Sequence, residues 1–114
     1  MIIANIRFTA NDDSSEKLRD VLTSLLGATQ AMSGCISCRL YLENNDSGSV
    51  LLLEEWKSIE DLTRHIASSN YRRVLEAMEL SNVAPEIKIY EVFDSKGFEF
   101  IESIRTNESI ENNH

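Results

Sequence analysis

The apolar residues between positions 18 and 26 recur with the spacing of one buried helix face, and strand-like runs lie on both sides of this segment. The five that follow the i, i+3, i+4, i+7, i+8 pattern are Leu18, Val21, Leu22, Leu25 and Leu26. Asp13 with Glu16 three residues later resembles a capping box at the start of this helix, and Gly34 is a stop signal after it. The preceding run IIANIRFT, residues 2–9, is rich in β-branched and aromatic residues and predicts a first strand.

The remainder of the chain predicts a hairpin, an interrupted helix and a last strand. Residues 35–43 and 50–57 are the hairpin strands, joined by the turn formers NNDSGS. A second helix follows, is interrupted by SSN at 68–70, and continues over residues 71–80. The segment EIKIYEV then alternates apolar and polar residues, as a strand does. The order β-α-β-β-α-β predicts a ferredoxin-like α+β fold, in which helices cover one face of an antiparallel sheet.

The two faces of this predicted sheet differ in character, because side chains alternate along a strand. The apolar set of the second strand, which we expect to face the helices, is Ile36, Cys38, Leu40 and Leu42. The set expected on the uncovered face is Cys35, Ser37, Arg39 and Tyr41. The last strand divides in the same way, with Ile87 and Ile89 facing the helices and Lys88 and Tyr90 on the uncovered face. A mixed uncovered face on so small a chain predicts a homodimer joined sheet to sheet, which would supply the missing core.

Both cysteines lie in the segment GCISCRLYL, with the C-x-x-C spacing of redox sites and of half a zinc site. In a regular strand Cys35 and Cys38 face opposite sides, with their Cα atoms roughly 10 Å apart. A disulfide tolerates at most about 7 Å between Cα atoms. A zinc site needs two further ligands, for which the sequence offers His65 and His114. We therefore expect two packing thiols, one on each sheet face, without a disulfide and without zinc.

The formal net charge of −8 argues against a nucleic-acid partner, because phosphate binding needs clustered lysine and arginine. Apolar runs such as residues 50–53 are far shorter than the ~20 residues of a membrane span. The N-terminal MIIANIRFT lacks the basic segment of a signal peptide, and two cysteines fit a reducing compartment. We expect a cytoplasmic protein that binds neither nucleic acid nor membrane.

The chain divides into three expected parts. Residues 1–93 form the domain. Residues 94–105 include KGFEFIESIR, which carries enough apolar surface to dock, and the partner subunit is the expected docking surface. Residues 106–114, TNESIENNH, are almost entirely polar and are expected to be mobile.

Three residues are unusual for their positions. Trp56 ends the third strand, and Asn5 interrupts an apolar first strand. His65 lies about 90° from the centre of the apolar stripe of its helix, where it can face a cleft between helix and sheet. That stripe consists of Ile59, Leu62 and Ile66. A core tryptophan, a surface histidine and an asparagine on the less apolar strand face are the ordinary interpretations, and a binding pocket is the alternative.

Glu54 and Glu55 are adjacent in the third strand, so one of them faces the helices if the strand is regular. We expect that carboxylate to be partly buried and paired with a cation. Arg39 and Lys57 are the candidate partners, and the alternation alone leaves open which glutamate is buried.

Several motifs follow one another in a fixed order between residues 34 and 92. They are GCISCRLY, EEWKSIEDLTRH, SSNY and PEIKIYEV. With the first strand and helix included, residues 1–93 resemble the antibiotic biosynthesis monooxygenase family. The resemblance implies a ferredoxin-like fold, dimers whose sheets form a shared α+β barrel, and a small pocket between sheet and helices. It also implies one of three activities: oxygenation of quinols and phenols without a cofactor, haem degradation, or isomerisation of a small phosphorylated metabolite.

The resemblance implies a site of four residues, with no cofactor and no metal. His65 would be the base that deprotonates a phenol, since an imidazole titrates near neutral pH. Trp56 and Tyr71 would form an aromatic wall, and Asn5 would orient a carbonyl or phenol oxygen. The haem-degrading branch carries an iron-ligating histidine four residues after the aromatic of the SSNY motif. Here that position is Leu75, which argues against haem degradation.

Three functions therefore remain open. The favoured one is a cofactor-independent monooxygenase that acts on a small quinol or phenolic aromatic. The others are a non-catalytic dimer that binds a small ligand, as in a stress response, and an isomerase of a small polar metabolite. An arginine-lined polar pocket would favour the isomerase, and an apolar aromatic pocket would favour oxygenation or binding.

Overall fold

The computed structural model describes residues 1–44 and 48–112. Four strands form the sheet: β1 (Ile2–Thr9), β2 (Cys35–Leu42), β3 (Ser49–Trp56) and β4 (Glu86–Glu91). The helices are α1 (Asp12–Gln30), α2 (Ile59–Ala67), the short 3₁₀ helix η1 (Ser69–Tyr71), α3 (Arg72–Leu80) and α4 (Phe98–Asn112). Within this part of the chain, no helix is both long and apolar enough to cross a membrane.

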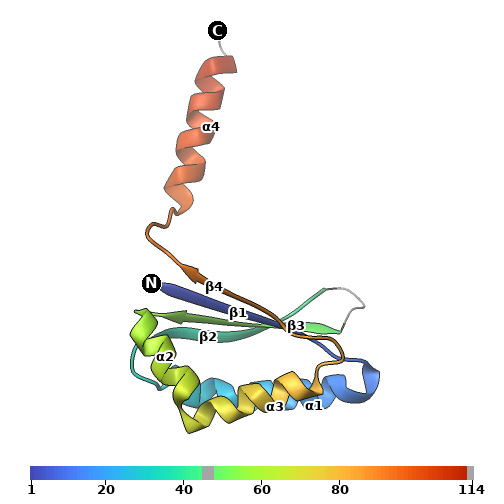
Figure 1. Cartoon of the computed structure of the whole chain (residues 1–114). Coiled ribbons are helices and arrows are strands. Elements are labelled where there is room, and N and C mark those ends of the chain that lie inside the picture. The colour runs from blue at the N-terminus through green and yellow to red at the C-terminus, as the bar shows by residue number, and fades with distance from the viewer. Residues whose placement is uncertain (45–47, 113–114) are drawn as a thin grey trace.

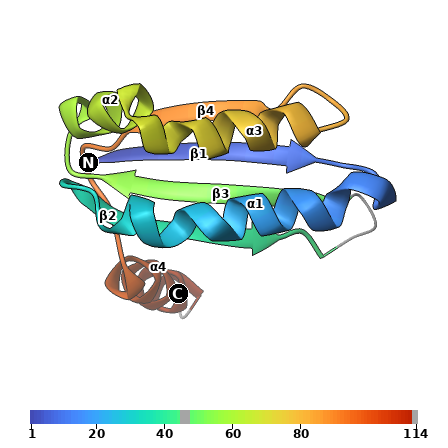
Figure 2. The same ribbon diagram turned by 90° about the horizontal axis from the view of Figure 1, so that it is seen from below.

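The strands form one antiparallel sheet in the order β2-β3-β1-β4, and α1, α2 and α3 lie on one of its faces (Figures 1 and 2). This confirms the predicted ferredoxin-like β-α-β-β-α-β fold. The predicted break in the second helix is also confirmed, because η1 separates α2 from α3. The turn of the β2–β3 hairpin includes residues 45–47, which lie outside the described residues.

The core lies between the sheet and the three helices. Burial alternates along the whole of β1, so that Ile2, Ala4, Ile6 and Phe8 face the helices. The predicted stripe of α1 packs on them: Leu18, Val21, Leu22 and Leu25 are buried, and Leu26 is partly buried. The cap of α1 lies earlier than predicted, since the Asn11 side chain accepts a hydrogen bond from the Ser14 backbone N–H at 3.2 Å.

The prediction that Cys35 and Cys38 face opposite sides of the sheet is wrong. The β2–β3 pairing shifts register between Cys35 and Ser37, which leaves Ile36 outside the ladder and exposed. Such a bulge adds one residue to a strand and therefore reverses the side-chain alternation beyond it. Cys35 consequently lies opposite Trp56 and Cys38 opposite Glu54, and both cysteines pack toward the helices as free thiols.

The edge strand β4 is only partly covered. Ile87 and Ile89 pair with the inward-facing Ile6 and Ala4, as predicted, yet they remain 52% and 50% exposed. The helices thus bury the middle of the sheet and leave half of each β4 isoleucine open to solvent.

The C-terminal helix α4 projects away from the domain on an extended connection (Figure 1). Its apolar side chains Phe98, Phe100, Ile101 and Ile104 are all exposed. The expected division at residue 105 falls inside this helix, and residues 113–114 of the expected mobile tail lie outside the described residues.

The two thiols should be poorly reactive in the native protein. Burial, reinforced by the negative charge of Glu54, raises the pKa of Cys38 to about 12 and also raises the pKa of Cys35. Because the thiolate is the nucleophile, we expect Cys38 to resist a brief iodoacetamide pulse at pH 8 and to react fully in urea. Peptide mass spectrometry after the pulse measures this, and rapid native labelling of Cys38 would show that this thiol is not buried.

Candidate functional site

A polar cluster lies in the core where β3, α2 and η1 meet. Glu54 and Trp56 are two residues apart on β3, so both point toward the helices. Leu62 and His65 are three residues apart on α2, so both point toward the sheet. Tyr71 ends η1 and closes the cluster from the side of the helices. Glu54 is 3% exposed and His65 is 0% exposed.

Glu54 is held by the indole and faces the imidazole. Its Oε1 accepts a hydrogen bond from Trp56 Nε1 at 3.0 Å. Its Oε2 lies 3.6 Å from His65 Nε2, and neither of these two buried atoms has a hydrogen-bond partner. A small side-chain rotation would bring them to the ~2.8 Å of a charge-assisted hydrogen bond.

Aromatic rings enclose the imidazole of His65. The Trp56 ring stacks on it with a centroid distance of 4.8 Å and an interplanar angle of 26°. The Tyr71 ring meets it edge-on, at 5.2 Å and 82°. Both contacts are typical aromatic geometries and fix the plane of the imidazole.

The second imidazole nitrogen contacts a methionine. His65 Nδ1 lies 3.0 Å from Met32 Sδ, and a thioether sulfur can only accept a hydrogen bond. In the tautomer with the proton on Nδ1, the Nδ1–H donates to Met32 Sδ. In the other tautomer, the Nε2–H faces Glu54 Oε2, and Nδ1 presents a lone pair that can accept a proton.

The surroundings of the cluster disfavour any additional negative charge. Burial, reinforced by the negative charge of Glu54, raises the pKa of Tyr71, so this hydroxyl stays neutral at physiological pH. The same two causes keep Cys35 and Cys38 protonated. An anion formed here would therefore need an imidazolium at His65 as its counter-charge.

The structure brings together three of the four site residues implied by the family resemblance and separates the fourth. His65, Trp56 and Tyr71 are in contact. Asn5 lies on the opposite, helix-free face, because the alternation of β1 directs its neighbours Ala4 and Ile6 toward the helices. Asn5 Oδ1 is buried there without a hydrogen-bond partner. It lines a cavity of about 190 Å³ together with Arg7, Leu51, Glu86, Lys88 and Tyr90.

The expected flank position of His65 is wrong. Leu62 and His65 form the buried face of α2, whereas Ile59 and Ile66 are exposed. The helix is turned so that its imidazole meets the buried carboxylate of Glu54. The expectation of one buried, paired glutamate is confirmed, but its partners are Trp56 and His65 and not Arg39 or Lys57.

Sequence reasoning missed Glu54 and Met32 as members of this cluster. Glu54 could have been identified, because it has the same strand parity as Trp56. Met32 could not, because it lies in the turn between α1 and β2, where no periodicity applies.

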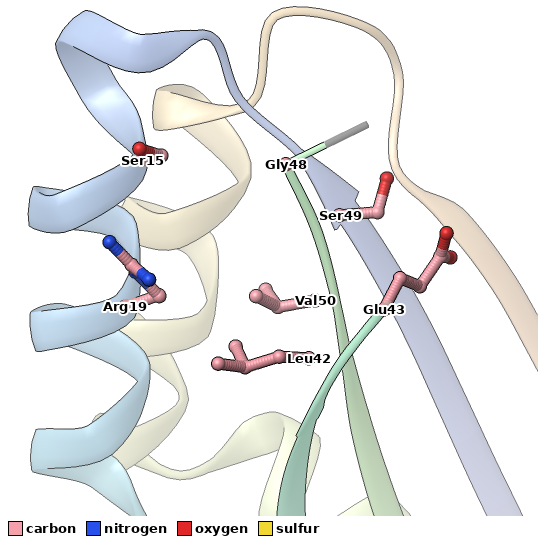
Figure 3. A pocket seen from close by; sticks show the side chains of 7 residues that line it. All are labelled: Ser15, Arg19, Leu42, Glu43, Gly48, Ser49 and Val50. Carbon is pink, nitrogen blue, oxygen red and sulfur yellow. The ribbon is translucent and has the colours of Figure 1, made fainter. Parts of the chain in front are cut away.

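Cavities elsewhere on the surface do not reach His65. Figure 3 shows one of about 170 Å³ at the other end of the sheet, where Leu42 and Val50 point toward α1 and Arg19 comes from that helix. Another, of about 390 Å³, adjoins Met1 and the connection to α4. A ligand can therefore reach His65 only if side chains around it move. Among the residues described, no group of three or more histidine, cysteine or acidic side chains is placed to hold a metal.

Removal of the Glu54 carboxylate should be strongly destabilising. Glu54→Ala leaves the Trp56 N–H and a buried imidazole without a partner, so we expect a loss of about 3 kcal/mol in the free energy of unfolding. Urea unfolding followed by circular dichroism measures the loss. Glu79→Ala, at an exposed position on α3, is the control and should change stability by less than ~0.5 kcal/mol. Equal effects of the two variants would show that the cluster is not coupled to folding.

The comparisons with solved structures agree with this fold. A candidate antibiotic biosynthesis monooxygenase from Deinococcus radiodurans superimposes with a TM-score of 0.78 at 21% identity, over 86% of this chain and 98% of that chain. A protein from Mycobacterium tuberculosis gives a TM-score of 0.76 at 26% identity, over 84% and 98% of the two chains. A conserved protein from Methanosarcina mazei gives a TM-score of 0.73 at 25% identity, over 79% and 90%.

No curated protein matches the sequence significantly. The family model described as antibiotic biosynthesis monooxygenase matches residues 1–77, which include Glu54, Trp56, His65 and Tyr71. This match supports a monooxygenase-like role in general terms. The chain belongs to the antibiotic biosynthesis monooxygenase family.

Proposed function

We propose that this protein is a cofactor-independent monooxygenase that oxidises a small quinol or phenolic aromatic, with His65 as the base. The observation that carries the proposal is an imidazole held between a buried carboxylate and two aromatic rings. An imidazole in this setting can take a proton, and the carboxylate of Glu54 stabilises the imidazolium that forms. The rings of Trp56 and Tyr71 provide apolar surface for an aromatic substrate.

The chemistry needs no other reductant, because the substrate supplies the electrons. The phenolic O–H gives its proton to His65, and the resulting phenolate is electron-rich enough to reduce O₂. A ring carbon forms a bond to oxygen, and the O–O bond of the peroxide then breaks. One oxygen atom stays on the ring and the other leaves as water, so that a quinol and O₂ give a hydroxyquinone and water. Asn5, on the other face of the sheet, has no role in this scheme.

A second function is favoured by one observation, the complete burial of His65. A base that no solvent reaches in the resting structure also suits a protein that binds a small ligand in this region without transforming it. The two functions share the ligand class and differ only in whether oxygen is consumed.

Oxygen uptake in the presence of quinols tests the proposal, with chelator present and without added flavin. We expect turnover by the wild type and a loss of at least ~100-fold in His65→Ala and His65→Gln, since a general base contributes about 10²–10⁴-fold. Glu60→Ala, at an exposed position on the same helix, should retain full activity. Full activity in a folded His65 variant would exclude His65 as the base. Quenching of Trp56 fluorescence by quinols that are never oxidised would instead support the binding function.

We also propose that the chain forms a homodimer through the helix-free face of the sheet. Leu51 and Leu53 lie half-buried in the middle of this face. Side chains of both charge signs surround them: Arg39, Lys88, Glu55 and Glu86. A two-fold axis can pair such a face with itself, because each positive group can meet a negative group of the other copy. The exposed apolar side chains of α4 would then dock on the partner subunit.

Light scattering at micromolar concentration should give a mass of about twice the 12.9 kDa of one chain. Leu53→Arg should shift the protein to the monomer, because it places an unpaired charge in the interface. Leu75→Arg is the matched control, since Leu75 is an exposed leucine on α3. A monomeric wild type, or a dimer unaffected by Leu53→Arg, would exclude this face as the interface.

A further inference from the structure

Four side chains surround the His65 imidazole, and one of them is a flexible, unbranched methionine. Glu54 faces Nε2, and the Trp56 and Tyr71 rings hold the plane. The fourth contact is the Met32 thioether on Nδ1, at 3.0 Å. We propose that the Met32 side chain is a displaceable plug and that the hydroxyl group of a phenolic ligand takes its place at Nδ1.

Met32 can leave this position by rotation of its side chain alone. The residue lies in the turn between α1 and β2, and its backbone is fixed on both sides. Its N–H donates to Thr29 O at 3.0 Å, and its C=O accepts from the Cys35 N–H at 3.1 Å. The side chain is partly exposed, unbranched and free to change rotamer. No movement of a helix or strand is needed to open this side of His65.

A hydroxyl group is a better partner for Nδ1 than a thioether. The sulfur accepts a hydrogen bond weakly and donates none. A hydroxyl group accepts from the Nδ1–H in the tautomer protonated there, and it donates to an unprotonated Nδ1 in the tautomer whose Nε2–H faces Glu54. The exchange therefore keeps a hydrogen bond at Nδ1 in both neutral tautomers, and in the second one the hydroxyl proton lies where His65 can accept it.

The space that Met32 would vacate suits an aromatic ring. Met32 packs against the buried cluster of Ile2, Ala4, Trp56 and Leu62, whose side chains are apolar apart from the indole N–H. The Trp56 N–H is already donated to Glu54 and cannot compete for the ligand. A ring placed there would have apolar contacts on its faces and one polar atom at Nδ1. This matches a simple phenol and excludes ligands with several charged groups.

This inference deepens the proposed function, on which the phenolic nature of the ligand rests, and it can be tested without turnover. In a His114→Gln background, His65 is the only histidine. Diethyl pyrocarbonate then reports the accessibility of its imidazole. We expect slow modification of this parent and a rate about tenfold higher in Met32→Ala, because the plug is missing. Met78→Ala is the matched control, since Met78 is partly buried against the main core cluster, which does not include His65. It should react as slowly as the parent.

Phenol binding, followed by Trp56 fluorescence, is the second measurement. Met32→Ala should bind phenol several-fold more tightly than the parent, because no side chain has to be displaced. Equal modification rates in the Met32 and Met78 variants would overturn the plug. Fast modification of Met32→Ala without tighter phenol binding would overturn the phenol site. Should Met32→Ala lose its native circular dichroism spectrum, Met32→Val replaces it with the same expected directions. Absence of oxygen uptake by the wild type would refute the proposed function. The modification rates and the phenol binding of Met32→Ala would still test the plug and the phenol site.

Discussion

The hydrogen bond from the Trp56 indole to the Glu54 carboxylate is the contact on which the helical layer depends. A carboxylate inside a core is costly unless its charge is shared and its oxygens are bonded. The indole satisfies one oxygen, and the other can be satisfied only from the helices. This requirement turns α2 so that His65 faces the sheet and the more apolar Ile59 and Ile66 face solvent. Tyr71 and Met32 then complete the enclosure of the imidazole.

The two faces of the sheet provide different chemical environments. On the helix side, Glu54 and Trp56 lie within an apolar core, where few other groups can exchange a proton with the Glu54 carboxylate. On the other side, Asn5 and Lys88 line an open, charged cavity beside the half-buried leucines of β3. Adjacent residues of one strand, Ala4 and Asn5, thus belong to different environments.

The fold was predictable because each helix and strand shows its own hydrophobic periodicity in the sequence. Few topologies are compatible with this order of helices and strands. The buried stripe of α1 and the break before Tyr71 were predictable for the same reason. The orientation of α2 was not, because it depends on a partner far away in the sequence. Hydropathy ranks Ile59 and Ile66 above His65, and only the buried Glu54 reverses this order. The bulge at Ile36 could not be predicted either, because an extra residue in one strand does not change the amino-acid composition in a recognisable way.

The burial of Glu54 and His65 has a consequence for the response of this protein to ionic strength. Both side chains are shielded from solvent, so dissolved ions have little access to them. The chain has a net charge of −8, and most of the charged side chains whose burial the structure describes are exposed. Added salt therefore relieves repulsion at the surface and leaves the interior cluster unchanged.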